Sequence, residues 1–456
     1  MEKNRTGAIL AIYLLGLLLG GLYVGMVAPV RTVIQEYFAI DSATGIWMIN
    51  IYSLFYAALI PVIGKIADLR GRKRVFIVCV LVFCLGAAMC GLSARFGGFA
   101  LLLAGRVVQA VGACGMIPVA NAELGTSMPP EKRGMALGIA AAVMGVSNVL
   151  GSAVGSAVLG VFGSANWSML FFVSLPAGVL LCVAAAMLLP NNKVASRGKL
   201  DYAGSVAFVA AVLVLLFALR RVDFLDLGAS VADPYVLGAF AVAAVLVVAF
   251  VLIERRAADP VFHLEYLRVR PIVITMVVSF FIGCITISMT LVPEFAEVAL
   301  GKAAGSGGYY VLAIGVTSIF ATPIGGKLID KRGAKPVLLF GLATAAVGYL
   351  FLAFVAAPHP SNALMIVGLM IVGLGMGFSM GAPTNYMILE NTDPSESASA
   401  IATITFVRQI GVTLAPAIFV GFIADGAGVG GYAVMLACIA AFALAGALLM
   451  LAYRPR

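Results

Sequence analysis

The chain has 456 residues, of which 62% are hydrophobic and only 11% are charged, and its mean hydropathy is +1.10. A soluble protein of this length could not bury so much apolar surface, so we predict an integral membrane protein. The net charge of +9 does not indicate nucleic-acid binding, because the basic residues cluster in short loops between apolar segments, where membrane topology explains them.

Apolar segments long enough to cross a bilayer follow one another along the whole chain. A transmembrane helix needs about 20 apolar residues, and counting on that basis predicts fourteen spans. The first span is too long for the core of a signal peptide and has no small-residue cleavage site, so we expect it to be retained. The spans cover residues 8–30, 44–66, 75–95, 98–120, 135–161, 168–189, 202–220, 235–253, 271–293, 308–328, 336–356, 363–385, 398–423 and 431–452.

Lysine and arginine residues are concentrated in alternate loops. Most of the 29 lie in the loops and chain ends on the same side of the membrane as the N-terminus. The positive-inside rule therefore places both termini in the cytoplasm. We expect a multi-pass protein of the plasma membrane.

One short basic loop with a single Asp occurs twice. Residues 64–74 read GKIADLRGRKR, and a weaker copy at residues 326–336, 262 residues later, reads GKLIDKRGAKP. Such a repeat predicts two related halves of six helices, with two additional helices between them. The predicted domains are an N-terminal bundle at 1–190, two central helices at 191–262 and a C-terminal bundle at 263–456.

No segment of the sequence indicates catalysis. The seven cysteines all fall in apolar segments, and none has the paired spacing of a zinc or redox site. The sequence has no nucleotide-binding loop, no metal cluster, no nucleophile–base pair and no soluble domain, so a membrane enzyme or receptor is disfavoured. We expect no cofactor and no bound metal.

The repeated loop and the fourteen-span plan resemble the major facilitator superfamily, and within it the fourteen-helix drug:proton antiporter group. The resemblance covers nearly the whole chain. It implies an all-α polytopic fold of two pseudo-symmetric six-helix bundles, with a central cavity lined by spans 1, 4, 9 and 12. It also implies transport by alternating access, with a proton as the coupling ion.

The first basic loop matches the group's signature between helices 2 and 3. The resemblance implies that Gly64 permits close helix contact and that Asp68 meets the positive end of a helix in the other half. Arg70 and Arg72 are expected to pair with acidic groups at the cytoplasmic surface. A carboxylate at a helix N-terminus gains about 0.3–1 kcal/mol, so breaking this contact would bias an inward–outward equilibrium. The alternative is that the basic cluster serves only as a topology anchor.

Glu123 ends the fourth span at the same face of the membrane. A carboxylate so near the hydrocarbon is costly unless it is paired, so Arg70 or Arg72 is the expected partner. The alternative is a solvated Glu123 at the membrane interface. The expected conformational gate is completed by further loop residues, which are Gly71, Asp330 and Gly333.

Polar and aromatic residues within the spans are candidates for a proton or substrate cavity. Arg106 and Gln109 lie in a segment similar to the group's helix-4 signature. An unpaired Arg at that depth costs at least about 2.5 kcal/mol. The resemblance implies a role for Arg106 in proton transfer, and the alternative is a structural Arg bonded to backbone carbonyls. The other cavity candidates are Tyr23, Arg31, Phe280, Phe281, Tyr386 and Arg408.

The fifth span carries a degraded form of the antiporter signature. Gly138, Gly151 and Gly155 stand where glycines are expected, whereas Ser147 replaces another glycine. The group links this motif to export, so its partial loss leaves the direction of transport open. Small residues at four-residue spacing allow helices to pack closely, either as static packing or as faces that move during transport.

The largest departure from the group is Tyr23, which stands where an acidic residue is usual. No carboxylate is expected near mid-membrane, whereas arginines lie within the spans, so we expect neutral or anionic amphipathic substrates. The main prediction is a proton-coupled exporter of amphipathic small molecules. The alternative is an organic anion or metabolite transporter that acts as an importer, exchanger or facilitator. The expected partners are the small-molecule substrate, protons and the lipid bilayer, and we expect a monomer that binds no nucleic acid.

Overall fold

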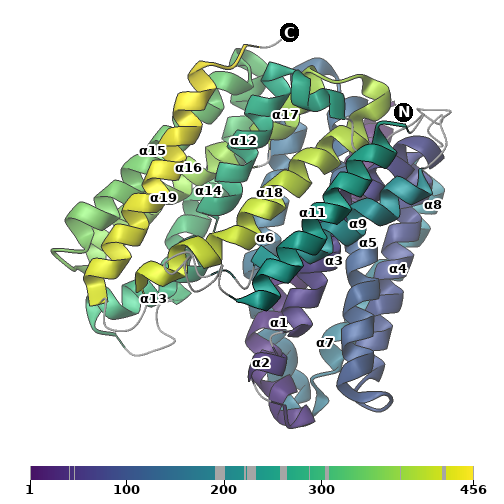
Figure 1. Cartoon of the computed structure of the whole chain (residues 1–456), viewed down its shortest axis with the longest axis horizontal. Helices are drawn as coiled ribbons and strands as arrows, with labels where there is room; N and C mark the ends of the chain where they lie inside the picture. The colour runs from purple at the N-terminus through teal and green to yellow at the C-terminus, as the bar shows by residue number, and fades with distance from the viewer. Residues whose placement is uncertain are drawn as a thin grey trace. The chain divides into compact units, whose positions relative to one another are not determined.

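Helices account for nearly all of the chain that the structure describes (Figure 1). No strand occurs among these residues, so the expected all-α polytopic fold is confirmed. The computed structural model describes residues 2–40, 42–45, 47–190, 201–219, 222, 233–256, 264–286, 288–302, 308–380, 382–423 and 428–454.

The helices follow one another with short connections. Short 3-10 or π-helical turns join or extend several of them. In chain order the α-helices are α1 (Glu2–Phe38), α2 (Ser42–Gly45), α3 (Trp47–Arg70), α4 (Arg72–Leu92), α5 (Gly98–Ser127), α6 (Pro130–Phe162), α7 (Met169–Phe172), α8 (Ser174–Leu188), α9 (Tyr202–Leu219), α11 (Pro234–Glu254), α12 (Arg270–Ile285), α13 (Ser288–Leu300), α14 (Gly308–Arg332), α15 (Ala334–Phe351), α16 (Asn362–Ser379), α17 (Ala382–Glu390), α18 (Ser397–Phe419) and α19 (Gly428–Leu451).

Eleven helical segments among the described residues are long and apolar enough to cross a membrane. Each of them overlaps one of the predicted spans. The other three predicted spans, 8–30, 135–161 and 271–293, fall on α1, on α6 and on the pair α12 and α13. The chain is therefore a multi-pass membrane protein, whereas the total of fourteen spans stays a prediction.

Several predicted spans comprise more than one helix. The span at 271–293 is divided between α12 and α13. In the span at 363–385, Met380 has an extended backbone (φ −78°, ψ 124°) after the end of α16. Pro383 is the second residue of α17, where its missing N–H costs nothing because the first N–H groups of a helix have no partner within the helix. A proline within a helix removes one hydrogen bond from the helix interior, so the start of α17 is a less costly position for Pro383.

The described helices form two compact units. Because these units follow contacts in space, each contains one short segment from the opposite sequence repeat. The three domains predicted from the sequence follow the repeat itself and stay a prediction. Unit 1 comprises Met1–Ser127, Val143–Asp201 and Asp393–Ala402, and unit 2 comprises Met128–Ala142, Tyr202–Thr392 and Thr403–Arg456.

Close helix packing recurs at equivalent positions of the two units. In unit 1, a Cβ on Gly112 of α5 would lie 2.3 Å from the backbone nitrogen of Phe83 in α4. In unit 2, a Cβ on Gly375 of α16 would lie 2.2 Å from the backbone nitrogen of Ala345 in α15. The two contacts are related by an offset of 262 or 263 residues, so they support the internal repeat.

A lysine at the start of one helix caps the end of another in each unit. The Nζ of Lys73 in α4 donates a hydrogen bond to the carbonyl oxygen of Leu189 after α8 (2.6 Å). The Nζ of Lys335 in α15 donates to the carbonyl oxygen of Leu451 at the end of α19 (3.1 Å). A cation at this position binds carbonyls that have no partner within the helix and complements the helix dipole. These basic residues therefore have a structural role in addition to their effect on topology.

The substitution Gly112→Ala should destabilise unit 1, because the added Cβ meets backbone atoms of α4. Overpacking of this kind costs about 1–3 kcal/mol. The matched control is Gly145→Ala in α6, where no described atom lies within 4 Å of the added Cβ and where Ala is the better helix former. Apparent melting temperatures of the purified variants measure the difference, and equal values would contradict the close packing of α4 and α5.

Candidate functional site

The carboxylate of Asp68 is buried at the end of α3, with 2% of the residue exposed. Its Oδ1 accepts a hydrogen bond from the backbone N–H of Ala398 (3.2 Å), and its Oδ2 accepts from the backbone N–H and the hydroxyl of Ser399 (2.8 Å each). The first N–H groups of a helix have no partner within the helix, and its positive end favours an anion. Asp68 therefore serves as the acceptor for the start of α18.

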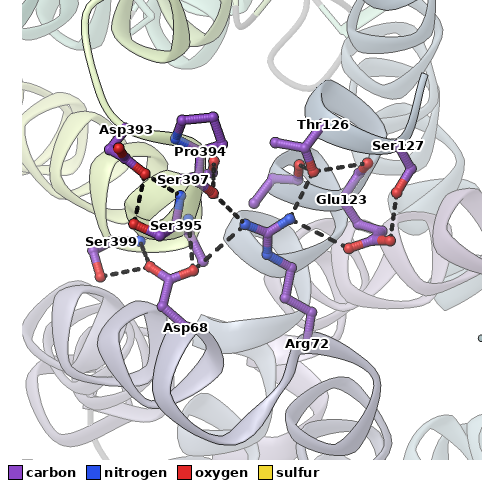
Figure 2. Close-up of polar contacts among 12 residues, drawn as sticks. Asp68, Arg72, Glu123, Thr126, Ser127, Asp393, Pro394, Ser395, Ser397 and Ser399 are labelled. Carbon is purple, nitrogen blue, oxygen red and sulfur yellow. Dashed lines mark hydrogen bonds and ion pairs between the residues drawn. The ribbon is translucent and has the colours of Figure 1, made fainter. Parts of the chain in front are cut away.

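Arg72, the first residue of α4, joins Asp68 to α5 (Figure 2). Its Nη2 lies 3.6 Å from Oδ1 of Asp68, and its Nη1 lies 3.4 Å from Oε2 of Glu123. Nη1 also donates to the hydroxyl of Thr126 (2.6 Å), and Nη2 donates to the carbonyl oxygen of Pro394 (3.3 Å). All three charged groups are buried. Two carboxylates flank one guanidinium, so one negative charge is left to interact with the N–H groups of α18.

Glu123 is paired and not solvated, which decides between the two alternatives that the sequence left open. Besides its ion pair with Arg72, its Oε1 accepts a hydrogen bond from the hydroxyl of Ser127 (2.6 Å). Arg70, the other candidate partner, is exposed at the end of α3. The buried position of Arg72 on the first turn of α4 places it between the two carboxylates.

The chain that leads into α18 is itself held by a cap. Asp393 accepts hydrogen bonds from the backbone N–H (2.8 Å) and the hydroxyl (2.6 Å) of Ser395, at the start of the 3-10 helix Pro394–Glu396. These bonds from Ser395 hold the pKa of Asp393 below its ordinary value. The cap fixes the turn that presents the carbonyl oxygen of Pro394 to Arg72.

Two glycines allow these elements to meet. A Cβ on Gly64 would lie 2.4 Å from the Cβ of Ala402 and 2.9 Å from the carbonyl oxygen of Ala398, so α3 and α18 can touch only because Gly64 has no side chain. Gly71 has a φ of 91°, in the region that glycine adopts readily. This conformation turns the chain between α3 and α4 and so positions Arg72.

A simpler copy of this arrangement lies in unit 2. The Oδ1 of Asp330, near the end of α14, accepts a hydrogen bond from the backbone N–H of Gly134 (2.6 Å), and its Oδ2 accepts from that of Met135 (2.9 Å) in α6. A Cβ on Gly326 would lie 2.5 Å from the carbonyl oxygen of Gly134. Gly333 has a φ of 78° and turns the chain into α15.

The two charged partners of Asp68 are not repeated at the equivalent positions of the second copy. Where the first copy has Arg72, the second has Ala334, and Tyr386 stands at the position equivalent to Glu123. The two copies share the Asp, the helix N–H groups that it accepts from, and the glycines. The first copy adds a buried guanidinium and a second carboxylate.

A second polar cluster surrounds Arg106 of α5 in unit 1. Arg106 is buried, its Nε donates to the carbonyl oxygen of Met48 (2.9 Å), and its Nη1 donates to Oε1 of Gln109 (2.6 Å). The guanidinium carbon lies 4.1 Å from the centre of the Tyr52 ring. Within the described residues, no carboxylate pairs with this charge. The Nε2 of Gln109 and the hydroxyl of Tyr52 are buried and have no hydrogen-bond partner in that part of the chain.

The cluster is therefore rich in donors. The bond to Met48 is the structural role that the sequence offered as one alternative for Arg106, and the role in proton transfer stays a prediction.

Tyr23 occupies a packing position in unit 1. Its hydroxyl donates to the carbonyl oxygens of Leu170 (2.8 Å) and Phe171 (3.1 Å), and its ring packs edge-on against Phe83 with the centroids 5.1 Å apart. These contacts account for the residue without a ligand.

The other five cavity candidates are half-buried and lie on four helices, α1, α12, α17 and α18. Phe280 and Phe281 are neighbours in α12, with ring centroids 5.9 Å apart. The assignment of these side chains to one cavity stays a prediction. The half-buried candidates are Arg31, Phe280, Phe281, Tyr386 and Arg408.

The motif residues of the fifth span lie on α6 and pack closely. A Cβ on Gly21 of α1 would lie 2.6 Å from the Cβ of Ser147, and a Cβ on Gly155 would lie 2.7 Å from the carbonyl oxygen of Met26. Gly138 instead packs on α14 in unit 2, where its Cβ would lie 2.9 Å from a carbonyl oxygen. Gly151 is buried in the same helix. The motif is a helix-packing face, and its link to export stays a prediction.

Sequence reasoning missed the hydroxyl groups that complete the polar network around Asp68, Arg72 and Glu123. Ser399 follows a segment, DPSES at 393–397, in which a capping Asp precedes a proline and a Glu stands three residues after the Asp, a pattern typical of a helix start. That pattern could have located the helix end that Asp68 meets. Thr126 and Ser127 carry no comparable signal.

Comparisons with known proteins agree with this architecture. A family model described as Major Facilitator Superfamily matches residues 13–416. YfiU of Bacillus subtilis (strain 168), an uncharacterized MFS-type transporter, is 30% identical over 430 residues, which is 93% of this chain and 81% of YfiU. Multidrug resistance protein 3 of the same organism is 28% identical over 82% of this chain and 71% of its own length. The structure of the proton:xylose symporter XylE bound to 6-bromo-6-deoxy-D-glucose has a TM-score of 0.73 at 12% identity, covering 100% of this chain and 97% of XylE.

The substitution Asp68→Asn should loosen the start of α18, because a neutral amide offers one acceptor oxygen in place of two charged ones. Loss of a charge-assisted hydrogen bond costs about 1.5–3 kcal/mol, so hydrogen exchange at the amides of Ala398 and Ser399 should become at least about tenfold faster. The control is Asp393→Asn, which removes a neighbouring cap without touching these two amides. Equal protection of both amides in the Asp68→Asn and unsubstituted proteins would show that Asp68 does not hold α18.

Proposed function

Because the chain belongs to the major facilitator superfamily, we propose that it is a proton-coupled exporter of amphipathic small molecules that works by alternating access. Membership of the family makes the protein a secondary transporter of a small molecule and not an enzyme. What we propose beyond family membership is the coupling ion, the direction of transport and the class of substrate.

The observation that carries the proposal is the buried bond between Asp68 and the start of α18. Asp68 and α18 come from different sequence repeats, so this bond couples the two halves of the transporter. A buried carboxylate is stable only while its partners are in place. When the bond breaks, water must replace the partners. The structure has this bond made, and the proposal adds a second state in which it is broken, as a conformational gate requires.

The further parts of the proposal follow from topology and similarity. Fourteen spans with both termini in the cytoplasm would place the Asp68 network, which lies among the basic loops, at the cytoplasmic face of the plasma membrane. The three predicted domains correspond to the two bundles and the two helices between them. Similarity to proteins named for multidrug resistance supports export of amphipathic compounds.

A second candidate function is transport of organic anions. It is favoured by the cluster at Arg106, where a buried cation has no carboxylate partner among the described residues and two further polar groups, on Gln109 and Tyr52, are unpaired. Three groups that can donate hydrogen bonds, one of them charged, suit a carboxylate, sulfonate or phosphate group. This arrangement agrees with the preference for neutral or anionic substrates.

Proton flux in energised inside-out vesicles tests the exporter directly. Addition of a transported lipophilic drug should dissipate the pH gradient, and Asp68→Asn should reduce that response to about a tenth or less, because losing a charge-assisted hydrogen bond shifts the balance between two states by about 1.5–3 kcal/mol. The control is Asp330→Asn, which affects the copy without the ion network and should have the smaller effect. A full response in the Asp68→Asn variant would show that transport does not require the bond between Asp68 and the start of α18.

The role of Arg106 separates the two candidate functions. If organic anions bind at this cluster, Arg106→Gln should weaken their apparent affinity by at least about tenfold, whereas Arg106→Lys should keep part of it because the charge remains. The measurement is proton flux or uptake with a series of organic anions, with melting temperatures to establish that both variants fold. Dissipation of the gradient by cations and neutral drugs, with no response to anions in any variant, would exclude the anion transporter.

A further inference from the structure

An open groove lies between α14 and α16 in unit 2, near the N-terminal ends of both helices. Its volume is about 650 Å³, which falls in the range of about 300–1,000 Å³ found for small-ligand sites. It is remote from the gate copy in the same unit, because Asp330 lies 14 residues, or about 20 Å of helix, beyond Val316 on α14. The groove is therefore a separate feature of the transporter.

Four large apolar side chains form the walls of the groove. Leu312 and Val316 come from α14, and Ile366 and Met370 come from α16; each is between 41% and 53% exposed. The small Ala313 also lines the groove. Each wall residue lies four positions from its partner on the same helix, so the walls run along the helices for about one turn. Such a channel matches a hydrocarbon chain that lies parallel to the helices.

One end of the groove is polar. The hydroxyl of Tyr310 donates to Oδ1 of Asn362 (2.5 Å), which joins the first turns of α14 and α16 and leaves the amide nitrogen of Asn362 as a donor. Lys302, just beyond α13, also lines the groove and is exposed. No carboxylate in the described part of the chain pairs with Lys302. The groove thus offers a cation and an amide donor at one end and only hydrocarbon beyond them.

Two of the equivalent positions in the first half of the chain hold different residues. Leu54, which is equivalent to Val316, is 6% exposed, and Ile40 stands at the position equivalent to Lys302. The cation and the exposed side chain at position 316 are therefore not repeated in the first half of the chain, so they do not follow from the repeated fold.

We propose that this groove binds an anionic phospholipid of the outer leaflet. One acyl chain lies between the apolar walls, and the phosphate lies beside Lys302 and Asn362. A phosphate forms charge-assisted hydrogen bonds with a lysine and an amide donor, and the basic side chain selects an acidic headgroup over a zwitterionic one. Placement in the outer leaflet rests on the topology proposed above, in which Lys331 and Arg332 mark the cytoplasmic end of α14.

Photo-crosslinking in vesicles tests the site. The full-length protein is reconstituted in phosphatidylcholine vesicles that contain a small fraction of lipid with a diazirine in its acyl chain, either phosphatidylglycerol or phosphatidylcholine. After irradiation, mass spectrometry locates the crosslinks. Phosphatidylglycerol should label residues 312–316 and 366–370 about fivefold more than phosphatidylcholine does, which is the preference expected from one lysine near the membrane surface.

Matched variants separate the headgroup from the groove. Lys302→Gln should abolish the preference for phosphatidylglycerol, whereas Arg95→Gln, at another exposed cation just after α4, should preserve it. Ile366→Trp should block labelling by filling the groove, whereas Val347→Trp, at a 58% exposed position of α15, should not.

Equal labelling of α14 and α16 by the two lipids in the unsubstituted protein would overturn the proposal, as would labelling spread evenly over other exposed apolar faces. Since no transport is measured, either result leaves the gate and the proposed function untouched.

Discussion

A carboxylate can stay charged in a buried place only if other groups replace the water that it has lost. At Asp68 these groups are two backbone N–H groups, one hydroxyl and one guanidinium. They come from the start of α18 and the first turn of α4, and Glu123 of α5 holds the guanidinium from its other side. Removing one partner of a buried pair costs about 3–5 kcal/mol. This single requirement therefore ties together the ends of four helices, and the glycines at 64 and 71 serve to satisfy it.

The two halves of the chain keep a common framework and differ in their chemistry. The helix-packing glycines, the lysine caps and the Asp that accepts from a helix start all recur at an offset of 262 to 264 residues. The ion network and the buried Arg106 cluster belong to the first half, whereas the groove at Lys302 belongs to the second. Equivalent positions hold Ala334 for Arg72 and Ile40 for Lys302. The scaffold is thus symmetric, and the sites placed on it are not.

The fold was predictable because lipid permits few solutions: a long apolar segment must be a helix whose backbone groups are all bonded. The contact of Asp68 with a helix start was predictable in outline, since one Asp between glycines and arginines carries a specific pattern, whereas the role of this contact as a gate stays a prediction. Sequence alone could not decide between Arg70 and Arg72 as the partner of Glu123, because the answer depends on whether the last residue of α3 or the first residue of α4 is buried. The break at Met380 and the groove at Lys302 also escaped prediction, since they depend on local backbone geometry and on the exposure of side chains from separate helices.

The most direct test of the gate is a distance measured across it in the membrane. Spin labels on Arg74→Cys and Asp393→Cys, both exposed residues beside the network, would report the separation of α4 from the segment that leads into α18. Pulsed electron paramagnetic resonance on a variant without reactive native cysteines should show a short and a long distance population, and Asp68→Asn should shift the balance toward the long one. A single distance that is the same with Asp68 and with the Asp68→Asn substitution would contradict the account. In that case α4 and the segment that leads into α18 would not move relative to each other, and the buried carboxylate would not control their separation.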